Sequence, residues 1–137
     1  MPIKVTVAVR NAMAQDIVDA IDAGAANGIV KILSGAQPVG PHIAISDQVA
    51  LSEHLLSKPC ATISNGIITF APISDDDFAN ATGAATWARF FDSNGNAVAD
   101  ATVSLAGGGG DLQMNTVNFV INGPVRFTSL SWVMPGA

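Results

Sequence analysis

Charge is the property that this sequence has least of. Only 12% of its 137 residues are charged, about half of the roughly 25% that is usual in globular domains. A small monomer needs charged residues on its surface to remain soluble. The low share of charged residues therefore favours a protein whose surface is partly covered by partners in an assembly. The alternative is a compact monomer whose many Ala and Gly residues form no adhesive patch.

Basic residues are especially few, and their scarcity excludes several kinds of partner. The chain has 6 Lys and Arg residues against 11 Asp and Glu residues, for a net charge of −5. An acidic chain without a basic stripe is unsuited to nucleic acid and to anionic membranes. No apolar run approaches the roughly 18 residues that a transmembrane helix needs. We therefore expect no nucleic-acid partner and no membrane partner.

Cysteine and tyrosine are also nearly missing. The chain has one cysteine and no tyrosine, and the lone Cys60 cannot form an internal disulfide, which is typical of a reducing compartment. We interpret Cys60 as a small buried hydrophobic side chain. The aromatic residues fall mostly at expected strand positions, which indicates core or interface rather than a sugar-binding surface. The length fits one domain, residues 1–137.

The first part of the chain has two different periods of hydrophobicity. Residues 1–10 alternate strictly and predict a half-buried strand, with an apolar face made of Ile3, Val5, Val7 and Val9. The period then becomes helical, and it predicts one amphipathic helix near residues 11–23 with Asn11 as its N-cap. Its apolar stripe is expected to contain Met13, Ile17, Ala20 and Ile21, flanked by Ala14 and Val18.

The rest of the chain is typical of short strands separated by turns. We expect a strand in residues 28–35, a loop in 37–47, a turn and a strand in 64–73, and an acidic loop in 74–83. Residues 49–57 fit a strand or a helical turn equally well. Residues 85–105 predict a hairpin around Asn94-Gly95, and residues 111–135 predict two strands around Asn122-Gly123, with a bulge near Asn115. This spacing predicts an all-β fold with one helix, specifically a jelly-roll-like antiparallel β-sandwich.

The four glycines in "LAGGGGDLQM", residues 105–114, raise the question of a phosphate-binding loop. Such a loop needs a following Lys, a Ser or Thr, and the start of a helix. This run is followed by Asp111, whose carboxylate repels phosphate, and then by strand-like sequence. We therefore interpret the run as a connection between strands, and we expect no nucleotide cofactor.

Several other polar segments contain the residue types of metal or catalytic sites. "DSNGN", Asp92 to Asn96, resembles the opening of a calcium loop, but Ala97 and Val103 stand where that loop needs Gly and Glu. Asp75 to Asp77 are adjacent and fit a solvated loop better than one ion. His42 and His54 lack the spacing of a zinc site, and Ser52, Glu53 and His54 have the residue types of a hydrolase without its motifs. We expect no metal, no cofactor and no catalytic residue.

The order of these features resembles a known family. The segments "RNAMAQDIVDAIDAGAANGIVKILSGAQP", "SNGIITF", "ATGAATWARFFDSNGNAVADATVS", "DLQMNTVNF" and "VRFTSLSWVMP" together resemble small virion proteins of tailed bacteriophages, in particular capsid cement, or decoration, proteins. The resemblance covers most of the chain and is weakest at residues 39–61. It is carried by β patterning and contains no active-site motif.

The resemblance implies a jelly-roll-like β-sandwich on the outside of an icosahedral capsid. Such a protein is made in the bacterial host cytoplasm, contacts the major capsid protein and can associate with itself as a dimer. We expect Ile3, Val5, Val7 and Val9 to contribute to these contacts, because an edge strand can pair with a neighbouring chain. For these four residues, a strand that simply pairs within its own sheet is the other explanation of the pattern. The alternative is a β-sandwich binding module of the phage tail that contacts a receptor or a carbohydrate.

Overall fold

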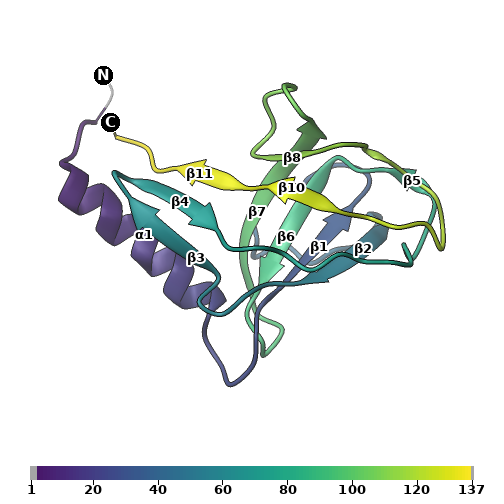
Figure 1. The fold of residues 1–137 in the computed structure, drawn as a ribbon, viewed down its shortest axis with the longest axis horizontal. Helices are drawn as coiled ribbons and strands as arrows, with labels where there is room; N and C mark the ends of the chain where they lie inside the picture. Colours follow the sequence, from purple (N-terminus) through teal and green to yellow (C-terminus); the bar gives the residue numbers. More distant parts are fainter. Residues whose placement is uncertain (1–2, 137) are drawn as a thin grey trace.

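The computed structural model describes residues 3–136, apart from the side chains of Thr128 and Ser129. This part of the chain forms one helix and eleven strands, so the prediction of an all-β fold with one helix is confirmed (Figure 1). In chain order the elements are α1 (Val7–Ile21), β1 (Ile29–Leu33), β2 (Ala50–Leu55), β3 (Ala61–Ser64), β4 (Ile67–Phe70), β5 (Gly83–Ala84), β6 (Trp87–Phe91), β7 (Ala97–Leu105), β8 (Leu112–Met114), β9 (Asn118–Phe119), β10 (Phe127–Ser129) and β11 (Ser131–Val133).

The strands form three sheets of unequal size. The large sheet has the order β10-β8-β7-β6-β1-β2, the small sheet has the order β11-β4-β3, and β5 pairs with β9. All pairs are antiparallel except β7 with β8, which is parallel. Only Leu130 separates β10 from β11, so one extended segment leaves the edge of the large sheet and joins the edge of the small one. The two sheets are thereby tied together.

The hydrophobic core lies between the two larger sheets and the helix. Phe70 of β4 and Phe90 of β6 come from opposite sheets, and both pack against Trp132 of β11 with ring centroids 5.0 and 4.8 Å away. The helix lies along β3 and β4 at one end of the molecule and adds its buried side chains to the same core (Figure 1). This arrangement is sandwich-like, with the helix closing one side.

The N-terminal strand prediction is wrong. Residues 3–6 form no strand, and helix α1 begins at Val7, before the expected start at residue 11. Thr6 is the N-cap in place of Asn11, and its side chain accepts a hydrogen bond from the Val9 N–H group at 3.2 Å. A Thr cap starts a helix by satisfying a free N–H group of the first turn. The alternating valines therefore lie in the exposed first turn of a helix.

The buried stripe of α1 also differs from the expected one. Its buried residues are Arg10, Ala14, Val18 and Ile21, whereas Met13 is 37% exposed. The stripe is therefore rotated relative to the prediction, and it extends toward the N-terminus by a charged residue. Arg10 falls within the strand predicted for residues 1–10 and outside the predicted helix.

Most of the β predictions hold, and two need correction. The strand at residues 29–33, the loop at 37–47 and the hairpin around Asn94-Gly95 are confirmed, and residues 50–55 are a strand. Residues 111–135 contain four short strands that join three different sheets, so no hairpin forms around Asn122-Gly123. The predicted bulge near Asn115 is instead the end of β8, after which the chain moves to pair with β5.

Candidate functional site

The glycine run connects β7 to β8, which are parallel neighbours. Val103 pairs with Leu112 and Leu105 pairs with Met114, so the chain must travel back past β7 within residues 106–111. Parallel pairs usually need a crossover of about a dozen residues or more. Gly107 and Gly109 make the short return possible by adopting φ values of +82° and +84°, which side chains rarely tolerate.

The backbone N–H groups of this loop are already occupied. Gly110 donates to the Ser104 hydroxyl at 2.9 Å, Gly107 donates to the Gln113 side chain at 3.0 Å, and Gly108 donates to the Leu105 carbonyl at 2.9 Å. A phosphate-binding loop needs such groups free and converging on the anion. The run is therefore a connection between strands, as expected.

The Asp92 to Asn96 segment is a hairpin turn. The Asp92 carboxylate accepts hydrogen bonds from the N–H groups of Asn94 and Asn96 and from the Asn96 side chain, at 2.9 to 3.1 Å. These bonds, led by the one from the Asn96 N–H group, lower the pKa of Asp92. Its oxygens thus organise the turn in the way that an Asx turn does.

The three adjacent aspartates do not converge on one point, because Asp75 and Asp77 face Arg126 whereas Asp76 accepts backbone hydrogen bonds. Asp75 and Asp77 lie 3.1 and 3.8 Å from the guanidinium of Arg126. Asp76 accepts hydrogen bonds from the Glu53 and Phe78 N–H groups. Within residues 3–136 no group of three or more His, Cys, Asp or Glu side chains is placed to hold a metal ion.

Ser52 and His54 do come together, because alternate residues of a strand share one face. The Ser52 hydroxyl lies 2.9 Å from Nε2 of His54, and Nδ1 of His54 lies 2.7 Å from the Ser74 carbonyl oxygen. A carbonyl can only accept, so Nδ1 carries the proton and Nε2 accepts from the serine hydroxyl. This is the contact that a serine nucleophile makes with its base.

Burial argues against catalysis by this pair. Ser52 and His54 are 0% and 1% exposed, and the His54 ring packs edge-on against Phe127. Glu53 lies on the opposite, exposed face of β2. Surface pockets of about 170, 280 and 350 Å³ occur elsewhere, and neither residue lines any of these three. Burial lowers the pKa of His54, so the pair is a neutral element of the core.

Cys60 is buried, as expected, and its thiol is a poor nucleophile. Burial and the nearby Asp22 carboxylate raise the pKa of its thiol to about 12. Only the thiolate is a good nucleophile. Asp22 itself accepts hydrogen bonds from the Cys60 N–H group at 3.1 and 3.2 Å, which ties the end of α1 to the start of β3.

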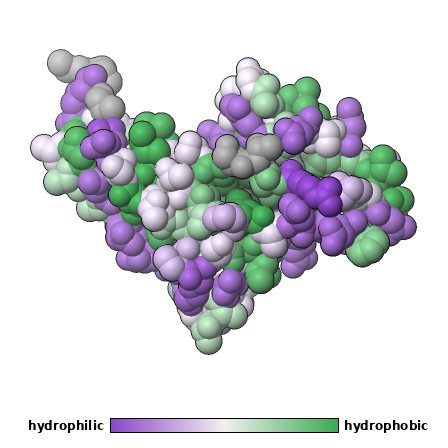
Figure 2. Space-filling model, viewed as in Figure 1, coloured by the Kyte–Doolittle hydropathy of each residue, from purple (hydrophilic) through white to green (hydrophobic). Residues whose placement is uncertain are grey.

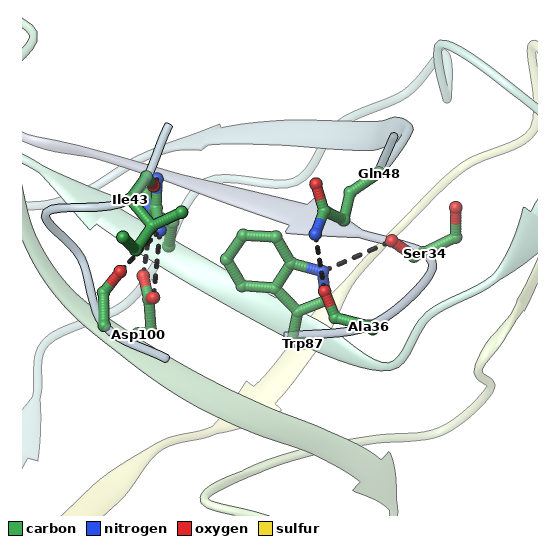
Figure 3. Close-up of polar contacts among 8 residues, drawn as sticks. Ser34, Ala36, Ile43, Gln48, Trp87 and Asp100 are labelled. Carbon is green, nitrogen blue, oxygen red and sulfur yellow. Dashed lines mark hydrogen bonds and ion pairs between the residues drawn. The ribbon is translucent and has the colours of Figure 1, made fainter. Parts of the chain in front are cut away.

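A buried cluster that the sequence did not reveal covers the outer face of the large sheet. The Arg89 guanidinium binds both carboxylate oxygens of Asp100 at 2.7 and 3.0 Å, and both side chains are 3% exposed. It also donates to the Ile43 carbonyl at 2.7 Å. These contacts hold the loop of residues 34–48 over Trp87, whose indole N–H donates to the Ser34 carbonyl (Figure 3).

The expected contact residues do not share one face. Ile3 is 80% exposed, Val7 and Val9 are 43% and 46% exposed, and Val5 is half-buried. The Val5 N–H group donates to the Gly136 carbonyl at 2.9 Å, so this segment binds the C-terminal segment of its own chain. Ile3, Val7 and Val9 remain open for contacts with other molecules.

Exposed apolar side chains are spread over the surface, and two groups of three of them lie at the two ends of the molecule. At one end, beside α1 and β4, are Ile3, Val7 and Val133, which we call the terminal surface. At the other end, near β5 and β9, are Phe78, Val120 and Ile121, which are 69%, 64% and 53% exposed and which we call the tip surface. Figure 2 shows hydrophobic residues at both ends of the molecule and further ones between them.

None of the described helices is long and apolar enough to span a membrane. Comparison of the chain with protein-family models, with curated proteins and with solved structures finds no match.

Proposed function

We propose that this chain is a structural virion protein, a capsid cement protein that binds the outside of an icosahedral phage head and stabilises contacts between major capsid proteins. The setting comes from the resemblance in the sequence. The observation in the structure that carries the proposal is the pair of apolar surfaces at opposite ends of a weakly charged molecule. A cement protein must contact two neighbours at once, and two separated surfaces serve that purpose.

The character of the two surfaces fits repeated, modest contacts. Each surface holds three exposed hydrophobic side chains, and such patches on a small protein often mark interaction sites. A single contact of this kind is weak, but many copies on a closed shell act together. The same surfaces offer a route to self-association as a dimer.

Uptake by capsids lacking this protein tests the proposal. Wild-type protein is expected to bind such particles up to a fixed ceiling and to raise the temperature at which they break open, because it binds only the assembled state. Replacing Phe78 and Ile121 with Ser, or Ile3 and Val133 with Ser, is expected to lower uptake. Unsaturable uptake, or unchanged particle survival, contradicts the proposal.

A matched control separates these surfaces from general hydrophobicity. Val39 is 98% exposed and belongs to neither surface. The Val39→Ser variant is expected to bind capsids like the wild type. If it loses as much uptake as the end variants do, the two surfaces are not the contacts.

The alternative, a tail-associated binding module for a receptor or carbohydrate, is favoured by one feature. Phe78 is an exposed aromatic side chain in a loop, directly after three aspartates, and aromatic faces with carboxylates suit sugar binding. Electron cryomicroscopy of the particle distinguishes the two functions by the position of this density on the head or the tail. Sugar binding that Phe78→Ala abolishes would support the tail module.

A further inference from the structure

Arg10 is a largely buried cation that lies between α1 and the turn joining β3 to β4. It lies on the core-facing side of α1 and is 8% exposed. Its side chain lies against Gly66 in the turn between β3 and β4, where an added methyl group would come within 2.8 Å of Nη1 and 2.9 Å of Cζ. The neighbouring Asn11 side chain accepts a hydrogen bond from the Gly66 N–H group at 2.7 Å and fixes the turn against the helix.

The Arg10 guanidinium has no counter-charge within the described residues. In residues 3–136 its Nε atom is buried without an acceptor, and none of the ion pairs involves Arg10. Of the acidic residues in α1 and its C-cap, Asp19 accepts a hydrogen bond from Gln15 and Asp22 accepts hydrogen bonds from Cys60. Asp16 forms none of the ion pairs within residues 3–136. A buried charge without a partner is strongly unfavourable.

The start of α1 adds to the positive field around Arg10. The first turn of this helix contains no acidic residue, and its N–H groups carry the positive end of the helix dipole. Positive field from the helix and positive charge from the guanidinium therefore coincide in a protein whose net charge is −5. The surroundings of the Arg10 guanidinium therefore favour the binding of an anion.

We propose that Arg10 is the receptor for a carboxylate that a partner protein supplies, an Asp or Glu side chain presented from an apolar surface. A guanidinium can bind both carboxylate oxygens through parallel N–H groups. Exposed hydrophobic neighbours fit such a surface, since Val7 lies one helical turn from Arg10 and Ile67 follows Gly66. The 8% of Arg10 that remains exposed is the side from which the carboxylate reaches it.

This proposal deepens the proposed function, because it assigns an ionic contact to the terminal surface. Carboxylate recognition by Arg10 is nevertheless measurable without a capsid. The test therefore has one arm with the protein alone and one arm with particles.

The first arm uses nuclear magnetic resonance of the arginine Nε–H groups, with butyrate as the probe. Butyrate combines a carboxylate with a short apolar chain, and butanamide is the uncharged match at the same ionic strength. Butyrate is expected to shift the Arg10 Nε–H signal saturably, whereas butanamide leaves it in place. Arg89 is the internal control, because its guanidinium already binds Asp100. An unmoved Arg10 signal, or equal shifts at Arg10 and Arg89, overturns the proposal. Equal shifts with sulfate show an unselective anion site and also overturn it.

The second arm uses Arg10→Met, which keeps much of the side-chain volume without the charge. The variant is expected to melt at the same temperature as the wild type or higher, because it removes an unpaired buried charge. Its affinity for capsids is expected to fall about tenfold or more, because the partner carboxylate loses its counter-charge. Arg126→Met is the control for loss of one positive charge at an exposed position.

The outcomes separate the receptor from the proposed function. Melting of Arg10→Met well below the wild type, or equal capsid affinity of the two proteins, overturns the receptor alone. If butyrate shifts Arg10 and Arg10→Met is stable, but wild-type protein does not bind capsids, the receptor stands and the cement function fails.

Discussion

Two buried arginines in this protein have opposite surroundings. Arg89, on the outer face of the large sheet, has a bidentate carboxylate partner and a backbone carbonyl within 3.0 Å. Arg10, between α1 and the small sheet, has neither among the described residues. Both are nearly inaccessible, at 3% and 8% exposed. Burial is therefore not what distinguishes them, and the difference lies in whether the chain supplies its own counter-charge.

The same difference extends to the two halves of the molecule. Among the described residues, two buried side-chain nitrogens lack an acceptor, Arg10 Nε and Trp132 Nε1, and both belong to the half formed by α1 and the small sheet. The buried polar side chains of the large-sheet half are all hydrogen-bonded: Ser52, His54, Arg89 and Asp92. The two halves therefore differ in whether their buried polar side chains find hydrogen-bond partners within the described chain.

Breaking the Arg89–Asp100 pair is expected to have the largest effect. Asp100→Ala leaves the buried guanidinium uncompensated, which typically lowers the free energy of unfolding by about 3–5 kcal/mol. The loop of residues 34–48 is expected to loosen as well, because Arg89 holds the Ile43 carbonyl. Chemical denaturation measures the change.

Asp75→Ala is the control for this variant, since it breaks the exposed contact with Arg126. Exposed ion pairs contribute about 0–1 kcal/mol. A loss below about 1 kcal/mol in Asp100→Ala would mean that the large sheet does not depend on its internal counter-charge.

Substitution of Gly66 is expected to have an intermediate effect. Gly66 has a φ of +74°, and an added methyl group would meet the Arg10 guanidinium. Left-handed backbone costs a side chain about 1–2 kcal/mol, and crowding of a packed side chain adds about 1 kcal/mol or more. Gly66→Ala is therefore expected to lower the free energy of unfolding by about 2–3 kcal/mol.

Gly95→Ala is the matched control, because Gly95 has a φ of +86° and open space around it. The difference between the two variants measures how tightly Arg10 is held. Equal losses would show that the Arg10 side chain moves aside freely, and the contrast with Arg89 would then lose its geometric basis.

The strands that could be predicted from the sequence are those whose pattern reflects local chain geometry. The residues of β1, β6 and β7 alternate or are bounded by turns, and the structure confirms them. The start of α1 was missed because Val7 and Val9 fit a strand pattern, and the signal that would have found it is the Thr6 cap. The four short strands after Gly110 join three sheets, and no local pattern specifies which sheet each one enters.

The candidate sites also differ in whether they depend on nearby residues or on contacts between distant parts of the chain. The hairpin role of Asp92 and the burial of Cys60 were predictable, since both depend on neighbouring residues or on residue type. The contact of Arg10 with Gly66, and the pairing of Arg89 with Asp100, depend on strand register and helix placement. Which buried charges are paired could therefore not be predicted from the sequence.

The smallest expected effect concerns His54, whose burial favours the neutral form of its ring. Burial lowers the pKa of His54 below its usual value near 6.5, so the unfolded chain takes up a proton at a higher pH than the folded chain does. The stability that this provides is present above about pH 6.5 and is lost as the pH falls from there toward the folded-state pKa, by at most about 1.4 kcal/mol per pH unit.

Denaturation curves between pH 7.5 and pH 5.5 are expected to show this loss in the wild type and in His42→Asn, which alters an exposed loop residue. In His54→Gln the loss is expected to be smaller. An equal slope in all three proteins, or a His54 resonance that titrates above the usual pKa, would show that the core around His54 tolerates the charged ring and that Ser52 and His54 are less finely matched than Arg89 and Asp100.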